Sequence, residues 1–113
     1  SISDSDRELY NTYNMTDVQI YEFALTEDDN AKQTYLSSLG WSSTKIQTFL
    51  NSFYENYFNS LEADDQEGFI EWGFTKKQIY EINHLSTDKI PNYLMDLGWA
   101  NEKIGEFMSA ISG

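Results

Sequence analysis

Residues 35–50 read YLSSLGWSSTKIQTFL, and residues 93–108 read YLMDLGWANEKIGEFM. The two stretches agree at their apolar positions and at one lysine, and both contain the tripeptide LGW. Gly40 and Gly98, which precede the tryptophans, are 58 residues apart. Agreement at a fixed offset indicates an internal repeat.

Two fainter copies of the same pattern lie between and before these stretches. They read LYNTYNMTDVQIYEFAL at 9–25 and GFIEWGFTKKQIYEIN at 68–83, and both contain QIYE. Asn14 and Gly73 take the place of the hinge glycine and are 59 residues apart. The four copies therefore predict a duplicated pair of units, with the first copy matching the third and the second matching the fourth.

Each copy places a residue that tolerates a left-handed conformation before a large apolar one. Glycine adopts that conformation freely, and asparagine adopts it more readily than most residues. The apolar side chain that follows can pack onto the helix just closed and onto the start of the next helix. We therefore expect a structural hinge in each copy, with the tryptophans buried by its closure. The predicted hinge residues are Asn14, Met15, Gly40, Trp41, Gly73, Phe74, Gly98 and Trp99.

Helix-start signals follow these hinges. Thr16 and Thr75 each stand three residues before a glutamine, which predicts capping boxes, and Ser42 is also a good N-cap. The fourth copy has Ala100 instead, so we expect its cap to shift to Asn101 or its helix start to be weaker.

Apolar spacings of three and four residues dominate the chain, and sustained alternation with a period of two is absent. The sequence therefore predicts an all-α fold: a compact bundle of about eight short helices, built from four helix-turn-helix units by internal duplication of a pair of about 58 residues. We expect a single domain over 1–113, with repeat halves at about 1–61 and 62–113. The expected helices are 4–13, 16–26, 30–39, 42–60, 63–72, 75–84, 88–97 and 100–111.

The charge of the chain is strongly acidic. Nineteen Asp and Glu stand against seven Lys and Arg among 113 residues, for a net charge of −12. Such a surface repels phosphate backbones, which argues against direct nucleic-acid binding, and it would suit a protein that competes with nucleic acid for a basic partner. No apolar run approaches the roughly 20 residues needed to cross a bilayer, so no transmembrane segment is expected.

Sequence patterns for catalysis, metals or cofactors are weak. No cysteine is present and His84 is the single histidine, which leaves no thiolate or His-rich metal site. The stretch DDQEGFIEWGFT at 64–75 fails as an EF-hand loop, because Gly68 is its fifth residue and Thr75 its twelfth. The sequence therefore predicts a protein that is not an enzyme and that holds no cofactor or metal.

Tyrosines offer the candidate interface. Tyrosine is amphipathic and has few torsions to order, so it is favoured at protein interfaces. We expect a partner, if there is one, on a tyrosine-containing patch rimmed by acids. The candidate interface residues are Tyr13, Tyr21, Tyr54, Tyr57 and Tyr80.

The hinge sequences GWSSTKI at 40–46 and GFTKKQI at 73–79 resemble the first loop of ubiquitin-associated domains. In that family the Gly-aromatic pair contacts the partner. The resemblance is confined to the hinge, so no ligand is carried over from it.

The function expected from these features is a non-catalytic protein-interaction module with an unknown protein partner. The alternative is an acidic mimic of nucleic acid that inhibits a basic DNA- or RNA-binding protein. The start at Ser1, the absence of cysteine and the abundance of Ser, Asn and Thr slightly favour an exported or cell-envelope-associated bacterial domain. The oligomeric state is left open.

Overall fold

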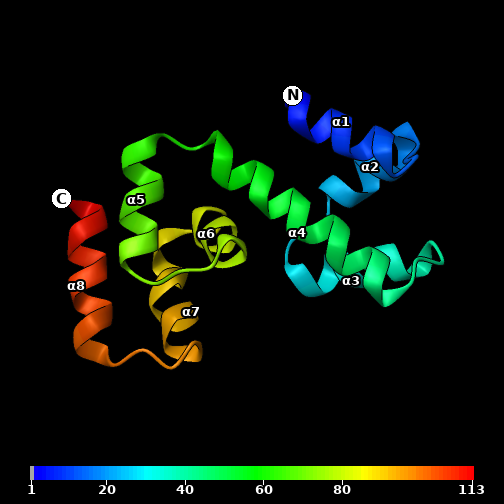
Figure 1. The fold of residues 1–113 in the computed structure, drawn as a ribbon. Helices are drawn as coiled ribbons and strands as arrows, with labels where there is room; N and C mark the ends of the chain where they lie inside the picture. Colours follow the sequence, from blue (N-terminus) through cyan, green and yellow to red (C-terminus); the bar gives the residue numbers. More distant parts are fainter. Residues whose placement is uncertain (1) are drawn as a thin grey trace. The chain divides into compact units, whose positions relative to one another are not determined.

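The computed structural model describes residues 2–113, and in this part of the chain it contains eight α-helices and no strand (Figure 1). The all-α prediction is therefore confirmed. The helices are α1 (Asp4–Thr12), α2 (Asp17–Ala24), α3 (Asp29–Ser38), α4 (Ser43–Ser60), α5 (Ala63–Glu71), α6 (Lys76–Asn83), α7 (Ile90–Asp96) and α8 (Asn101–Ser112), with a 3-10 turn η1 (Thr87–Lys89) before α7.

The seventh helix differs from the expected range of 88–97. Residues Thr87–Lys89 form the 3-10 turn, and the α-helix begins at Ile90 with Pro91 in its first turn. Proline has no N–H to donate, so it is tolerated there and its fixed φ favours a helix start.

The chain divides into two compact units, the first up to Tyr80 and the second over Glu81–Gly113. The predicted repeat halves meet near residue 61 instead. They are defined by similarity between sequences, whereas the two compact units are defined by contacts in space. The halves stay a prediction.

The first unit is built around the longest helix, α4, on which α1 and α3 pack. Its core is rich in aromatic rings that meet edge to face, the geometry that ring quadrupoles favour. The ring centroid of Phe23, on α2, lies 5.4 Å from that of Phe49 and 5.2 Å from that of Phe53, both on α4. The ring centroid of Tyr10, on α1, lies 6.3 Å from that of Phe23. Three helices thus share one aromatic core.

In the second unit α7 packs against α8. The buried apolar side chains of this unit are Ile82, Ile90, Leu94, Ile104 and Phe107. Leu94 and Phe107 are almost wholly shielded from solvent, so they form the centre of this smaller set.

The helix endings take a left-handed residue at the predicted hinge positions. The φ angles are +55° at Asn14, +87° at Gly40, +89° at Gly73 and +91° at Gly98. The following N–H donates to the carbonyl five residues back: Met15 to Tyr10 at 3.0 Å, Trp41 to Leu36 at 3.4 Å, Phe74 to Phe69 at 3.3 Å and Trp99 to Leu94 at 3.1 Å. This bond is characteristic of the Schellman ending.

The next helices start with the expected caps. The Thr16 hydroxyl accepts from the backbone N–H of Gln19, whose side chain accepts from the Thr16 N–H, and Thr75 and Gln78 form the same capping box. Ala100 stands at the N-cap of α8 without a side-chain hydrogen bond. Of the two outcomes expected for this copy, the structure has the weaker start.

Candidate interaction surface

The hinge ring Trp41 is only half-buried, so the expectation that hinge closure buries it fully is wrong. Its ring stacks on the ring of Tyr13, with 5.5 Å between the ring centroids, and packs edge to face with Phe49, with 5.3 Å between the centroids. The Lys45 ammonium lies 4.2 Å from the ring centroid. Contacts from buried Phe49, half-buried Tyr13 and exposed Lys45 hold the ring without excluding solvent from it.

Trp99 repeats this arrangement in the second unit and is also half-buried rather than fully buried. It meets the edge of Phe107 at 5.8 Å, and Lys103 lies 4.0 Å from its centroid. In both units the lysine stands four residues after the tryptophan, and the phenylalanine stands eight residues after the tryptophan. Cation–π contact stabilises each ring in place, so the structure gives both hinge tryptophans an internal packing role.

The candidate interface tyrosines do not gather into one patch. Tyr54 is 4% exposed, which corrects its prediction as a surface residue. Tyr80 is half-buried and packs edge to face on Tyr54 at 5.2 Å and on Tyr57 at 5.1 Å, while Tyr13 stacks on Trp41. Among the five candidates in the described chain, Tyr21 alone is largely exposed.

Tyr54 is buried because its hydroxyl completes a polar cluster around Asp29. The Tyr54 hydroxyl donates to Asp29 Oδ1 at 2.6 Å, the Gln33 amide donates to Oδ2, and Lys77 Nζ lies 3.4 Å from Oδ2. Asp29 itself is 7% exposed. Helices α3, α4 and α6 are thereby linked through one carboxylate.

The cluster keeps Asp29 ionised. Burial by itself raises the pKa of this carboxyl, but the hydrogen bonds from Tyr54 and Gln33 and the charge of Lys77 outweigh it. The pKa of Asp29 therefore lies below its ordinary value of 3.8. A carboxylate with a lowered pKa and occupied oxygens is a poor general base at neutral pH, so its chemistry is structural.

Lys32, one turn along α3 from Asp29, is also buried. Its ammonium donates to the Thr26 carbonyl at 3.1 Å and lies over the rings of Phe23 and Tyr80, at 5.5 Å and 5.2 Å. These contacts fix the loop between α2 and α3, and they place a positive charge among aromatic faces that attract it.

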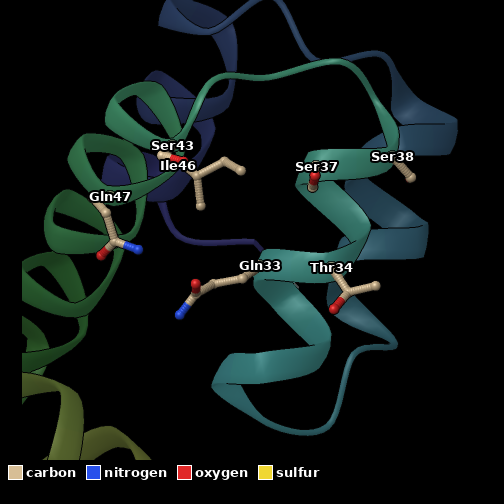
Figure 2. A pocket seen from close by; sticks show the side chains of 7 residues that line it. All are labelled: Gln33, Thr34, Ser37, Ser38, Ser43, Ile46 and Gln47. Atoms are coloured by element: carbon tan, nitrogen blue, oxygen red, sulfur yellow. The ribbon is translucent and has the colours of Figure 1, made fainter.

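A shallow groove of about 490 Å³ lies between α3 and α4 (Figure 2). Figure 2 shows Gln33, Thr34, Ser37 and Ser38 on α3, with Ser43, Ile46 and Gln47 on α4. The lining therefore holds hydroxyls and amides, and it holds no histidine, carboxylate or lysine. Without a base to activate a serine, the groove does not support nucleophilic catalysis.

The most exposed large apolar side chains of the first unit lie on α2 and at its C-cap, Leu25. Val18, Tyr21 and Leu25 are 65%, 66% and 62% exposed. Their spacing of three and four residues places them on one face of the helix, while Phe23 enters the core. We call these three residues the α2 patch. Exposed Asp17 and Glu22 lie on the same helix.

Sequence reasoning singled out Tyr21 but missed Val18 and Leu25. The signal was present, because the apolar residues of 17–25 occupy two sides of the helix rather than one. What the sequence could not show is which side a neighbouring helix covers.

No known family matched the sequence, and no characterised protein or solved structure was similar enough to count as a match. Within the described residues no group of His, Asp and Glu is arranged to hold a metal ion. No helix there combines the length and the apolarity that a membrane span requires.

Proposed function

We propose that this chain is a non-catalytic protein-interaction module. The observation that carries the proposal is the α2 patch, three large apolar side chains that share one helix face and are each more than half exposed. Scattered single apolar residues on a surface are ordinary, whereas large contiguous apolar patches rimmed by polar residues mark interaction sites. Association that covers the patch would remove this apolar area from water.

The test is capture of partners by the immobilised chain from cell extracts and envelope fractions of the source organism, with identification by mass spectrometry. Washing at about 1 M salt shortens the Debye length to ~3 Å and releases partners held by surface charge alone. The proposal expects specific proteins that survive this wash. Capture no better than on bare matrix would contradict it.

A second candidate function is an acidic mimic of nucleic acid. The contacts that the basic side chains make within the chain favour this candidate. In the described chain, five lysines contact a ring or a carboxylate: Lys32, Lys45, Lys76, Lys77 and Lys103. These cations are therefore held against the protein's own rings and carboxylates, and the chain as a whole has a net charge of −12. This candidate expects basic nucleic-acid-binding proteins in the capture that elute with salt.

We also infer that the fold arose by internal duplication, and paired contacts support this. The Tyr35 hydroxyl donates to Glu22 at 2.8 Å, and the Tyr93 hydroxyl donates to Glu81 at 2.7 Å. In both hydrogen bonds the acceptor is the glutamate of a QIYE stretch, and the donor is the first tyrosine of the next copy of the repeat. An experimental structure in which residues 35–50 and 93–108 failed to superpose would end the inference.

A further inference from the structure

We propose that the α2 patch is the docking site for a basic amphipathic helix of a protein partner. The inference rests on the proposed interaction function and adds the chemistry of its partner. Two observations within the first unit carry it. One gives the shape of the partner and the other gives the sign of its charge.

The shape follows from how the same tetrapeptide is covered elsewhere in the first unit. Tyr80, in the QIYE of α6, packs edge to face on three rings of α4: Phe53 at 5.4 Å, Tyr54 at 5.2 Å and Tyr57 at 5.1 Å. Phe53 and Tyr54 are four and three positions before Tyr57, so all three belong to one broad apolar face of α4. A helix that presents aromatic side chains at this spacing thus covers the tyrosine of this tetrapeptide on α6.

Tyr21 holds the corresponding place in the QIYE of α2, yet it is 66% exposed. The tetrapeptide is the same and lies on a helix in both places, but the covering helix is missing from the described structure at Tyr21. A helix with apolar or aromatic residues at the α4 spacing would therefore fit against Tyr21, and Val18 and Leu25 extend the exposed apolar face on either side of it.

The charge of the partner follows from the two residues that immediately precede QIYE in each copy. On α6 these include Lys76, which lies 4.0 Å from Glu55, and Lys77, which lies 3.4 Å from Asp29. The partners of α6 are thus acidic. On α2 the corresponding residues are Asp17 and Val18, so the side chain that Asp17 meets must be basic or neutral instead.

The surroundings of the patch favour a basic partner further. Asp17, Glu27 and Asp28 lie just before and after the patch residues in the sequence and are exposed. A second copy of this chain would bring its own charge of −12 against them, and a nucleic acid would be repelled in the same way. A helix with lysines flanking its apolar stripe matches both the apolar face and its acidic rim.

The test uses the full chain and two synthetic peptides. The first peptide is a helix of roughly five turns with Phe, Tyr and Tyr at the α4 spacing and lysines on both flanks. The second is its twin with each lysine replaced by glutamate. Binding is followed by fluorescence anisotropy for the wild type, the V18A/Y21A double variant and the control I70A. Ile70 is 53% exposed on α5 in the same unit and lies outside the patch.

We expect the basic peptide to bind the wild type and the I70A control alike, and to bind V18A/Y21A at least about tenfold more weakly, because truncating an interface aromatic is costly. The acidic twin is expected to bind at least about tenfold more weakly than the basic peptide. Unfolding curves check that both variants fold, which is expected because the replaced side chains are largely exposed. Equal binding by V18A/Y21A, or no binding of the basic peptide, overturns the docking site.

Failure of this inference is distinguishable from failure of the proposed function. Proteins captured from extracts equally by the wild type and by V18A/Y21A would leave the interaction module standing and overturn α2 as its site. Equal or tighter binding of the acidic twin would overturn the basic chemistry. Concentration-dependent self-association of the chain that V18A/Y21A abolishes would overturn it in favour of a second copy.

Discussion

Gly98 and Gly105 have opposite backbone requirements seven residues apart. Gly98 has a φ of +91°, whereas Gly105 lies inside α8, and a Cβ built on either meets nothing within 4 Å. Gly98→Ala should cost roughly 1–2 kcal/mol through left-handed strain alone. Gly105→Ala should add about 0.5–1 kcal/mol of stability, because glycine is a poor residue within helices. Urea unfolding of the two variants measures both values, and changes of the same sign would contradict this account of the hinge.

Trp41 tests how much a half-buried hinge ring contributes to stability. Its ring keeps part of its surface in water, while Phe49 beneath it is fully buried. Trp41→Ala should therefore cost about 2 kcal/mol, less than the ~3–5 kcal/mol typical of a buried aromatic, which is what we expect for Phe49→Ala. Denaturant unfolding of both variants provides the comparison. A larger loss for Trp41→Ala than for Phe49→Ala would show that the hinge ring is the true centre of the core.

At the scale of the elements, Asp29 links α3, α4 and α6 and should make their packing sensitive to acid. Because its pKa is lowered in the folded state, its contribution is present above the unfolded pKa of about 4 and is lost as the pH falls through the folded value. Asp29→Asn should therefore be less stable than the wild type by ~1–3 kcal/mol at pH 7. The difference should shrink below about pH 4.

The measurement is urea unfolding of both proteins across this acidic range. The control is Asp88→Asn, since Asp88 is exposed; its stability should follow that of the wild type. A difference between Asp29→Asn and the wild type that does not change with pH would show that the ionised carboxylate is not what holds the three helices together.

Helix ends could be predicted from the sequence more readily than helix faces. Hinge residues such as Gly73 and caps such as Thr75 act on backbone groups of their immediate neighbours, so local sequence contains the information. The 3-10 turn before Pro91 was missed because Ser86 at its N-cap marks a helix start of either kind, and 3-10 turns are frequent at the N-termini of α-helices. Tyr54 lies within the apolar stripe of α4, between Leu50 and Phe58, so helical spacing favours its burial, and its selection as an interface residue rested only on the amphipathic character of tyrosine.

The α2 patch shows the same limit. Apolar residues on both sides of a helix predict that it is buried on both sides, or that it binds something. Which of these holds for Tyr21 depends on whether another helix reaches it, and this is decided by residues far away in the sequence. Tyr80 stands in the same tetrapeptide and is covered, so the tetrapeptide alone does not decide whether its tyrosine is exposed.

At the scale of the whole molecule, the charge of −12 should make thermal stability depend on salt. Acids outnumber the cations that could pair with them, so the folded chain repels itself at low ionic strength. Raising the salt from about 0.01 M to about 0.15 M shortens the Debye length from ~30 Å to ~8 Å. Tm should rise over this range, because surface ion pairs such as Lys76 with Glu55 are worth little. Calorimetry in the two buffers measures it, and a lower Tm at higher salt would contradict net repulsion.

We propose that the hinges build the fold and that the α2 patch binds the partner, and chemical-shift mapping on the labelled chain locates the binding site. The isotope-labelled chain is titrated with the lysine-flanked peptide, and amide shifts are followed by NMR. The account expects the largest changes along α2, at and around Val18, Tyr21 and Leu25. Changes centred on Trp41 or Trp99, or spread evenly over the acidic surface, would contradict it.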